Sequence, residues 1–422
     1  MSAEVKPGFK QTEAGVLPVD WEAKKLGEVA SFRTGPFGSA LHKSDYTNDG
    51  IPVVNPMHIL DGRIVPTTSM TITEEAAKSL DEFRLSLGEV IIGRRGDMGR
   101  CAVVSERERG WLCGTGSMIV RPSVLVNAYF LQRVLSTPSI IKAIEDSSVG
   151  STMINLNQAT LSNLVVQAPS VEEQRAIAAT LSDMDALISN LDQLVTKKRD
   201  IHQAAMQQLL TGQRRLPGFS GAWDVKPMRA LGNTYGGLAG KTKIDFGHGE
   251  ARYIPFMNVM TDTVIDASWL EPVDVAPDEA QNLAKKGDLF FNGSSETPEE
   301  VGFCSVLLDE IQNLYLNSFC FGFRFNTAAK VNGLFFAYWF RSKAGRAAMS
   351  VLAQGATRYN IAKSAFMLLE IPQPLEEEQT AIATVLSDMG AELAALEVRR
   401  QKALQLKQGM MQELLTGRIR LT

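Results

Sequence analysis

Two short polar segments of this 422-residue chain carry side chains suited to contacts with the edges of DNA bases. Each follows an apolar run that opens with a glycine and an acidic residue, and they read Gly93-Arg94-Arg95-Gly96 and Asn292-Gly293-Ser294-Ser295. Arginine can bind guanine O6 and N7 with two hydrogen bonds, and asparagine can bind adenine in the same way. A solvated turn is the alternative for either segment, but their matching positions favour contact with a ligand.

Motifs for catalysis are incomplete. Gly240-Lys241-Thr242 matches the end of a phosphate-binding loop, yet Tyr235 stands where that motif requires its first glycine, and no apolar helix follows. Asn55-Pro56-Met57-His58 has one proline and no aromatic residue, whereas an adenine amino-methyltransferase needs two prolines and an aromatic residue beside the extruded base. We therefore expect this chain to catalyse no reaction.

The histidines and cysteines lack the spacing of a metal site, and the cysteines include no C-x-x-C pair. We expect solvated or structural roles for His42, His58, His202 and His248, and buried free thiols at Cys101, Cys113, Cys304 and Cys320. The sequence therefore predicts that this chain itself binds no metal and no cofactor.

The elements that must position the polar segments form a unit that is used twice. Residues 172–216 and 377–421 align without a gap at a constant offset of 205, and 22 of the 45 aligned positions are identical. A repeat of about 200 residues is too long for a solenoid unit, so each copy is expected to be a domain plus a connecting element.

The repeated segments carry a heptad seam of apolar residues, which predicts a coiled coil. The seam positions are Ile177, Leu181, Met184, Ile188 and Leu191 in the first copy, and Ile382, Leu386, Met389, Leu393 and Leu396 in the second. Ser170 and Glu173 form a capping-box pattern, and Gly212 and Gly417 are expected to end the helices in the left-handed conformation. Beyond the seam its spacing continues through polar residues, where the pair is expected to loosen, change register or meet a partner.

Chain connectivity predicts the direction of the two helices. Each helix of about 40 residues would be ~60 Å long, so the facing ends of a parallel pair would lie ~60 Å apart. The compact domain that joins them spans only about 40 Å. We therefore predict an antiparallel pair with one domain at each end; the alternative is two helices that pack separately, each on its own domain.

The predicted fold class is α+β, with an internal pseudo-two-fold repeat. Two α/β domains, residues 1–168 and 216–373, alternate with the two long helices, residues 169–215 and 374–422. Residues 150–155 of the first domain line up with residues 355–360 of the second, whereas the interiors of the domains diverge. A shared frame with divergent loops is typical of two domains that recognise different targets.

Composition describes an ordinary globular protein, with 45% hydrophobic and 21% charged residues and a net charge of -4. That net charge does not itself indicate a nucleic-acid partner. Phosphate binding needs a local basic surface, and the average charge hides how the charges are distributed. The longest strongly apolar run, residues 334–340, is far shorter than the ~20 residues of a bilayer span, and no secretory signal pattern is present. We expect a cytoplasmic protein with no membrane contact.

Over essentially its whole length the chain resembles the specificity (S) subunits of type I restriction-modification systems. The motifs are Gly35-Pro36-Phe37-Gly38-Ser39-Ala40-Leu41 with Asp45-Tyr46 and Gly50-Ile51-Pro52-Val53, the strand starts at Gly88 and Gly287, and Gln-x-x-Ile-Ala at Gln174 and Gln379. The second domain instead opens with Gly236-Gly237-Leu238-Ala239-Gly240-Lys241-Thr242, so its target is expected to differ from that of the first.

The resemblance implies two target recognition domains, each reading one half of a bipartite sequence in double-stranded DNA. The helix pair would set the spacer between the halves and dock two modification (methyltransferase) subunits, through which restriction (translocase and nuclease) subunits join. S-adenosylmethionine, Mg and ATP are then expected only in those partner subunits. The alternatives are a tandem coiled-coil adaptor that binds proteins, and a recognition subunit of another DNA defence complex.

The candidate DNA-binding residues come from the polar segments, the collinear domain ends and the basic residues near them. They are Arg33, Lys43, Arg94, Arg95, Arg100, Thr152, Asn155, Lys241, Lys243, Asn292, Ser294, Ser295, Thr357, Arg358, Tyr359 and Asn360.

Overall fold

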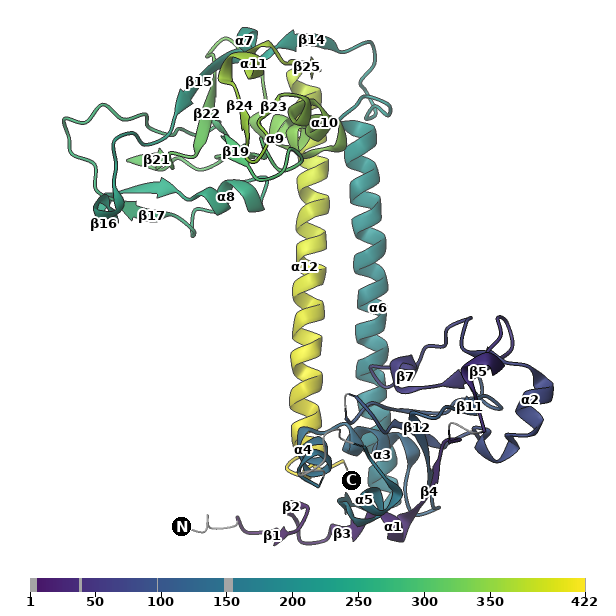
Figure 1. Cartoon of the computed structure of the whole chain (residues 1–422). Helices are drawn as coiled ribbons and strands as arrows, with labels where there is room; N and C mark the ends of the chain where they lie inside the picture. Colours follow the sequence, from purple (N-terminus) through teal and green to yellow (C-terminus); the bar gives the residue numbers. More distant parts are fainter. Residues whose placement is uncertain (1–5, 38–39, 97, 148–154, 422) are drawn as a thin grey trace. The chain divides into compact units, whose positions relative to one another are not determined.

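The computed structural model describes residues 6–37, 40–96, 98–147 and 155–421, and the chain divides into two compact units. Unit 1 comprises Met1–Leu191 with Arg399–Thr422, and unit 2 comprises Asp192–Val398. Each unit holds one globular domain, half of the long helix α6 (Val171–Leu209) and half of the long helix α12 (Glu376–Leu414) (Figure 1). The boundary between the two units thus falls within both long helices.

The two domains have the same strand order. In unit 1 the antiparallel sheet runs β10 (Cys101–Val103), β9 (Val90–Gly93), β12 (Ser117–Pro122) and β4 (Ala30–Thr34). In unit 2 the corresponding order is β20 (Cys304–Val306), β18 (Leu289–Asn292), β22 (Cys320–Phe325) and β15 (Gly232–Gly236). The predicted shared frame is therefore confirmed strand by strand.

A smaller three-stranded sheet accompanies each large one. It contains β11 (Leu112–Cys113), β5 (Ile51–Val54) and β8 (Thr71–Ile72) in unit 1, and β21 (Leu314–Leu316), β16 (Phe246–Ile254) and β17 (Glu271–Val273) in unit 2. In both units its first two strands are parallel and its last two antiparallel. The helices α3 (Ala128–Leu135) and α4 (Pro138–Asp146) in unit 1 correspond in order to α9 (Gly333–Arg341) and α10 (Lys343–Val351) in unit 2.

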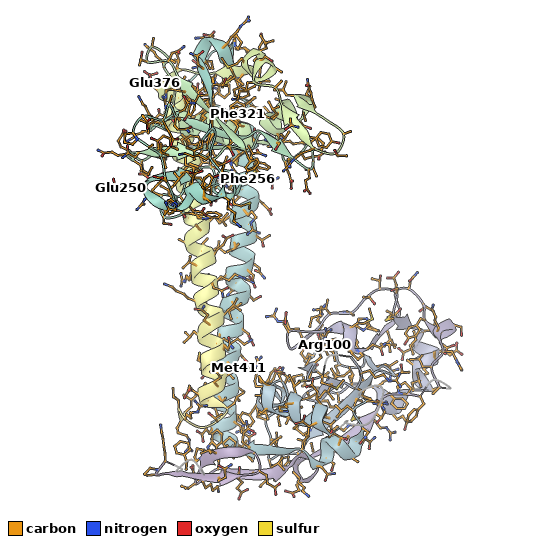
Figure 2. The ribbon with its side chains drawn as sticks, turned by 60° about the vertical axis from the view of Figure 1, so that its left-hand side comes forward. Arg100, Glu250, Phe256, Phe321, Glu376 and Met411 are labelled. Atoms are coloured by element: carbon orange, nitrogen blue, oxygen red, sulfur yellow. The ribbon has the colours of Figure 1, made fainter. Side chains whose placement is uncertain are left out.

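The two domain cores share a plan but use different side chains. The core of unit 1 is aliphatic where unit 2 has rings: Ile92, Met118, Val120, Leu135 and Leu161 stand where the other core has Phe291, Phe321, Phe323, Phe340 and Phe366. Phe291 packs against Phe321, Phe340 and Phe366 with ring centroids 4.9 to 5.2 Å apart. Figure 2 shows Phe321 inside this domain. Apolar volume, rather than residue identity, maintains the common fold.

In each domain a strand near the start of the domain pairs with the last strand, which leads into a long helix. In unit 1 β3 (Glu22–Lys25) pairs with β13 (Val165–Ala168), and in unit 2 β14 (Asp224–Pro227) pairs with β25 (Glu370–Gln373). Trp21 and Trp223 immediately precede the first strand of each pair. Their indole N–H groups donate to Glu173 and Glu378, which lie in the first turns of α6 and α12, at 3.0 Å in each case.

The same two glutamates bind an arginine that follows the other long helix. Arg420, beyond the end of α12, binds Glu173 at 2.7 Å, and Arg215, beyond the end of α6, binds Glu378 at 2.5 Å. Ser170 accepts the N–H of Glu173 at 3.2 Å, as predicted for a cap. The reciprocal half of the predicted capping box is wrong, because the Glu173 carboxylate binds Trp21 and Arg420 instead.

A buried glutamine joins each long helix to its domain. Gln174 accepts the N–H of Asn127 at 2.8 Å and donates to the carbonyls of Leu125 and Pro169 at 3.1 and 2.9 Å. Its repeat counterpart Gln379 accepts the N–H of Asn332 at 2.8 Å and donates to the carbonyls of Lys330 and Pro374 at 3.4 and 2.8 Å. Because both side chains are almost fully buried, these amides fix the helix start relative to the first turn of α3 or α9.

Within each unit the two helix halves run antiparallel, as predicted. In unit 1 Asp185 of α6 pairs with Lys407 of α12 at 2.6 Å, while the earlier Glu173 pairs with the later Arg420. In unit 2 Lys198 pairs with Glu392 at 2.7 Å, while Arg215 pairs with Glu378. The polar continuation of the seam is thus occupied at these positions by ion pairs between the helices.

The seam residues belong partly to the domain cores. Ile177 and Leu181 share the core of unit 1 with Leu414 and Leu415, which rules out helices that pack separately on their own domains. The buried seam positions are Ile177, Leu181, Ile188, Leu191, Ile382 and Leu386, and the half-buried ones are Met184, Met389, Leu393 and Leu396. Gly212 and Gly417 follow the helices with φ of 69° and 67°, which confirms the predicted left-handed ends.

Replacing Gln174 by alanine should destabilise the protein by about 2–4 kcal/mol, because the N–H of Asn127 and the carbonyls of Leu125 and Pro169 would be buried without partners. Gln193→Ala, at an exposed position of the same helix, should change the free energy of unfolding by less than about 0.5 kcal/mol. Denaturant unfolding of the two variants measures both effects. Equal stabilities would contradict the structural role of the buried amide.

Candidate nucleic-acid interface

Three segments meet at one end of the large sheet in each domain. The first segment follows β9 or β18, and the second is the turn before β12 or β22. The N–H of Arg94 in the first segment donates to the carbonyl of Gly116 in the second at 2.8 Å, and the N–H of Gly293 donates to the carbonyl of Phe319 at 3.0 Å. The third segment bonds to the same residues, since Leu156 N–H donates to Arg94 at 2.9 Å and Ile361 N–H to Gly293 at 3.1 Å. The structure therefore makes the two predicted polar segments equivalent.

We name these sets site 1 and site 2. Site 1 comprises residues 93–96, 98–100, 114–117 and 155–157, and site 2 comprises residues 292–303, 317–320 and 359–361. In site 2 the contact is a short sheet, in which β19 (Ser294–Ser295) pairs with β24 (Tyr359–Ile361). The loop after the first strand is four residues longer in site 2, because seven residues separate β9 from β10 and eleven separate β18 from β20.

A side-chain amide holds the middle turn in both sites, but it comes from different places in the chain. In site 1 the Asn55 Oδ1 atom accepts the N–H of Gly116 at 3.3 Å, and in site 2 the Asn317 Oδ1 atom accepts the N–H of Phe319 at 2.9 Å. The same backbone geometry is thus maintained with unrelated local sequences.

Asn55-Pro56-Met57-His58 is the structural support of site 1. The N–H of Asn55 donates to His58 Nδ1 at 3.1 Å, and His58 Nε2 lies 3.2 Å from the Thr67 hydroxyl. Pro56 packs under the site, because a Cβ atom on Gly93 or Gly116 would lie 3.1 or 2.8 Å from the proline ring. Burial lowers the pKa of His58 below its usual range.

Arg94 and Arg95 have different surroundings despite being neighbours. Arg94 is buried and donates to the Leu156 carbonyl at 3.1 Å and to Asn155 Oδ1 at 3.2 Å. Burial, with a smaller effect from Arg95, lowers the pKa of Arg94. Arg94 therefore fixes the site internally and orients Asn155, whereas the exposed Arg95 is placed to meet a ligand.

Asn292 is a loop-holding residue, contrary to the base-contacting role expected from the sequence. Its side chain is completely buried. The amide nitrogen donates to the carbonyls of Ser294 and Glu300 at 3.3 and 2.9 Å, and the amide oxygen accepts the N–H of Phe303 at 2.6 Å. With its amide committed to the loop main chain, Asn292 presents no edge to solvent in this structure.

Two of the predicted basic contacts are paired with acids. Arg33 forms an ion pair with Glu82 and lies over the ring of Phe83, and Lys241 binds Glu279 at 2.5 Å. The hydrogen bond from Lys241 is the main cause that lowers the pKa of Glu279 to about 2. Either side chain could contact a phosphate group only after leaving its present acidic partner.

Lys43 and Lys243 occupy equivalent exposed positions. Each begins a one-turn helix, Lys43–Asp45 or Lys243–Asp245, whose aspartate accepts the N–H of the residue before the lysine at 2.6 Å. The glycine-rich openings are also equivalent, because a Cβ atom on Gly35 or Gly237 would lie 2.0 or 1.9 Å from the carbonyl oxygen of Gly114 or Asn317. The second domain thus keeps this close approach without the Pro-Phe-Gly sequence.

The remaining predicted residues lie around the sites. Ser294 and Ser295 are half-buried in site 2, and Ser295 donates to Glu300 at 3.1 Å. Tyr359 is half-buried and Thr357, Arg358 and Asn360 are exposed. Arg100 is half-buried and is the last residue of the site 1 loop, immediately before β10 (Figure 2). Thr152 lies outside the described residues.

Phe319 is a site residue that sequence reasoning missed. Its side chain is 63% exposed in the middle turn of site 2, where site 1 has Gly116. Only the structural equivalence of the turns reveals the contrast, because the flanking sequences share no motif.

The described residues do not suggest metal chemistry. Within the described ranges, no His, Cys, Asp and Glu side chains are grouped in threes so as to hold a metal ion. All four cysteines are buried free thiols, and burial raises the pKa of Cys101 to about 11 and that of Cys320 to about 12. None of the helices in the described part of the chain has the length and apolar composition that a bilayer crossing requires.

The chain belongs to the family of type I restriction modification DNA specificity domains, whose family model matches residues 18–197 and 281–406. It is 28% identical over 184 residues to the type I restriction enzyme MjaIX specificity subunit of Methanocaldococcus jannaschii, a match that covers 43% of this chain and 42% of that protein. It is 22% identical over 180 residues to the type I restriction enzyme EcoBI specificity subunit of Escherichia coli, covering 43% of this chain and 38% of that protein. The chain spans about half the length, or less, of the curated relatives it matches.

Solved structures show the same fold. The S subunit of a type I restriction-modification system from M. genitalium matches with a TM-score of 0.57 and 14% identity, over 98% of both chains. The HsdS subunit from Thermoanaerobacter tengcongensis matches with a TM-score of 0.50 and 18% identity, over 96% of this chain and 98% of that one. The predicted α+β fold with two repeated domains and long helices is thereby confirmed.

Protonation of His58 should destabilise the protein, because it would put a proton on the Nδ1 atom that accepts from Asn55. The pKa of His58 is lowered by folding, so the unfolded chain binds more protons below the ordinary histidine pKa of about 6.5, and stability is lost as the pH falls through that value. The free energy of unfolding should therefore fall less between pH 7.5 and 5.5 for His58→Gln than for the unmodified chain. Burial also lowers the pKa of His202, but this histidine contributes equally to the pH dependence of both proteins. Identical pH dependence would contradict this assignment.

Proposed function

We propose that this chain is the non-catalytic DNA-specificity subunit of a type I restriction-modification complex. Each domain reads one half of a bipartite target in double-stranded DNA, and the helix pair sets the spacer between the halves. The observation that carries the proposal is the equivalence of sites 1 and 2 in main-chain hydrogen bonds, combined with their different exposed side chains. Equivalent frames with unlike surfaces suit two half-sites of different sequence.

The chemistry of the sites supports reading in the major groove. Base edges there differ in donors, acceptors and methyl groups, and arginine recognises guanine by two hydrogen bonds. Arg95 presents such a donor pair in site 1, whereas Ser294, Ser295 and Asn360 present smaller polar groups in site 2. Lys43 and Lys243 are suited to phosphate contacts that position each domain without reading sequence.

The helix pair is also the proposed docking surface for two modification (methyltransferase) subunits, and restriction (translocase and nuclease) subunits would join through them. S-adenosylmethionine, Mg and ATP belong in this proposal to the partner subunits, and the complex works in the cytoplasm. The repeated helices support two equivalent dockings, because a surface that occurs twice can bind the same partner twice.

Two alternatives give different results in a simple assay. A coiled-coil adaptor that binds proteins would show no salt-dependent affinity for random duplex DNA, whereas a DNA-binding subunit loses affinity steeply with salt as counterions are released. A recognition subunit of another defence complex would bind DNA in the same way, but its partners would lack an adenine methyltransferase.

Replacing Arg95 by alanine should relax the sequence preference at one base pair of one half-site by about 1–3 kcal/mol, because the substitution removes a bidentate donor. The other half-site should stay unchanged. Arg109→Ala is the matched control: its side chain is exposed, and it follows the end of β10 that lies away from site 1. Selection from a randomised duplex library, with the assembled complex, measures both variants. Loss of preference in both half-sites would contradict separate reading by the two domains.

Deleting one heptad from each helix, residues 190–196 and 395–401, should shorten the preferred spacer by about 3 base pairs, because seven helical residues span ~10 Å. The half-site sequences should remain the same, since sites 1 and 2 are untouched. The same selection reports the spacer and the half-sites together. Altered half-sites with an unchanged spacer would contradict the proposal that the helices set the spacing.

A further inference from the structure

Phe319 is an aromatic side chain displayed on a rigid turn. The residue is 63% exposed, although burial of a phenylalanine side chain is worth about 1.5–3 kcal/mol. Its N–H donates to Asn317 Oδ1 at 2.9 Å, and its carbonyl accepts the N–H of Gly293 at 3.0 Å. Both polar atoms of the residue are therefore fixed while the ring itself faces solvent.

Asn317 makes this turn part of the domain interior. It is only 6% exposed, and its amide nitrogen donates to the Ile254 carbonyl at 3.1 Å. The N–H of Cys320, the first residue of β22, closes the turn on the Asn317 carbonyl at 3.4 Å. A ring held in this way loses little conformational freedom when it meets a ligand, which favours binding.

The first domain has no place for such a ring. The equivalent residue is Gly116, and a Cβ atom there would lie 2.8 Å from the Cδ atom of Pro56. The ring is therefore a difference built into the equivalent turns, and it distinguishes what the two sites can recognise.

The residues near Phe319 indicate which chemical group of a ligand its ring would contact. Gly293, which it holds, leads directly into Ser294 and Ser295, and these pair with Asn360 and Tyr359 in the short sheet. Site 2 thus contains an exposed aromatic ring and hydrogen-bonding residues on adjoining segments. In the major groove, thymine presents the same combination, a 5-methyl group beside the O4 acceptor.

We propose that Phe319 contacts the 5-methyl group of a thymine in the half-site read by the second domain, and so determines specificity at that base pair. This inference rests on the proposed function, and it specifies one base, thymine, and one chemical group, the 5-methyl group, that the second domain would recognise. Because Gly116 has no side chain, we expect no matching methyl contact in the half-site of the first domain.

Selection from a randomised duplex library is the first test, with the unmodified chain and Phe319→Ala compared in the assembled complex. The variant should lose a preference for thymine at one position of one half-site and keep the other half-site. Phe319→Leu should retain part of that preference, because it keeps apolar volume. Leu368→Ala is the control: this side chain is also exposed, but it ends α11 (Lys363–Leu368), which packs against α7 (Met228–Leu231) rather than in site 2.

Replacing that thymine by deoxyuridine is the second test, because it removes the methyl group and leaves the hydrogen-bonding edge intact. The unmodified chain should bind the deoxyuridine duplex about three- to tenfold more weakly, as expected for one buried methyl group. Phe319→Ala should bind both duplexes equally.

The possible outcomes separate the proposal from the function on which it rests. If the unmodified chain selects no sequence, both fail. If it selects a bipartite sequence but Phe319→Ala leaves every thymine preference intact, the methyl contact alone is overturned. A uniform loss of affinity in the variant, with no effect of deoxyuridine, would also overturn it and favour a wedge between base steps.

Discussion

Main-chain hydrogen bonds between three segments hold the rim of each domain in one arrangement. The carbonyls of Gly116 and Phe319 accept from the first segment, and the carbonyls of Arg94 and Gly293 accept from the third. Backbone groups carry these bonds, so the side chains at the same positions are free to differ without loss of the frame. This explains how one fold can present Arg95 in one domain and Phe319 in the other.

The frame is useful only if each domain is fixed on the helices that carry it. Gln174 and Gln379 provide that connection with matching sets of buried hydrogen bonds, and the carboxylates of Glu173 and Glu378 add a tryptophan and an arginine to each junction. The arginine always comes from beyond the other helix, so each unit is completed by a distant part of the chain. Proposed spacing of two half-sites depends on such junctions, because a loosely attached domain could not maintain a distance.

The sequence predicted the features that are repeated or periodic. The constant offset of 205 identified the helices, the heptad seam identified their apolar face, and connectivity identified their antiparallel direction. Gly212 and Gly417 ended the helices where a left-handed residue was expected. The equivalence of the two polar loops also followed from sequence, because each comes directly after a strand that opens with a glycine and an acid.

What the sequence did not predict depends on contacts between distant residues. Asn292 has the right chemistry to bind adenine, but its environment commits the amide to its own loop. Arg33 finds an acid 49 positions away, at Glu82, and no local pattern predicts that pair. Asn55 accepts from a residue 61 positions later in the chain, whereas Asn317 accepts from a residue two positions later, so the same role is filled from unrelated places in the sequence. Exposure of Phe319 is likewise a property of the folded turn.

Long-read sequencing can map methylated adenines in cells that carry this chain together with the modification and restriction subunits proposed as its partners. If each domain reads one half-site, the methylated positions should define one bipartite motif, with two unlike half-sites and a spacer of constant length in which no base is preferred. A single uninterrupted motif, or two identical half-sites, would contradict reading by two equivalent frames with different side chains.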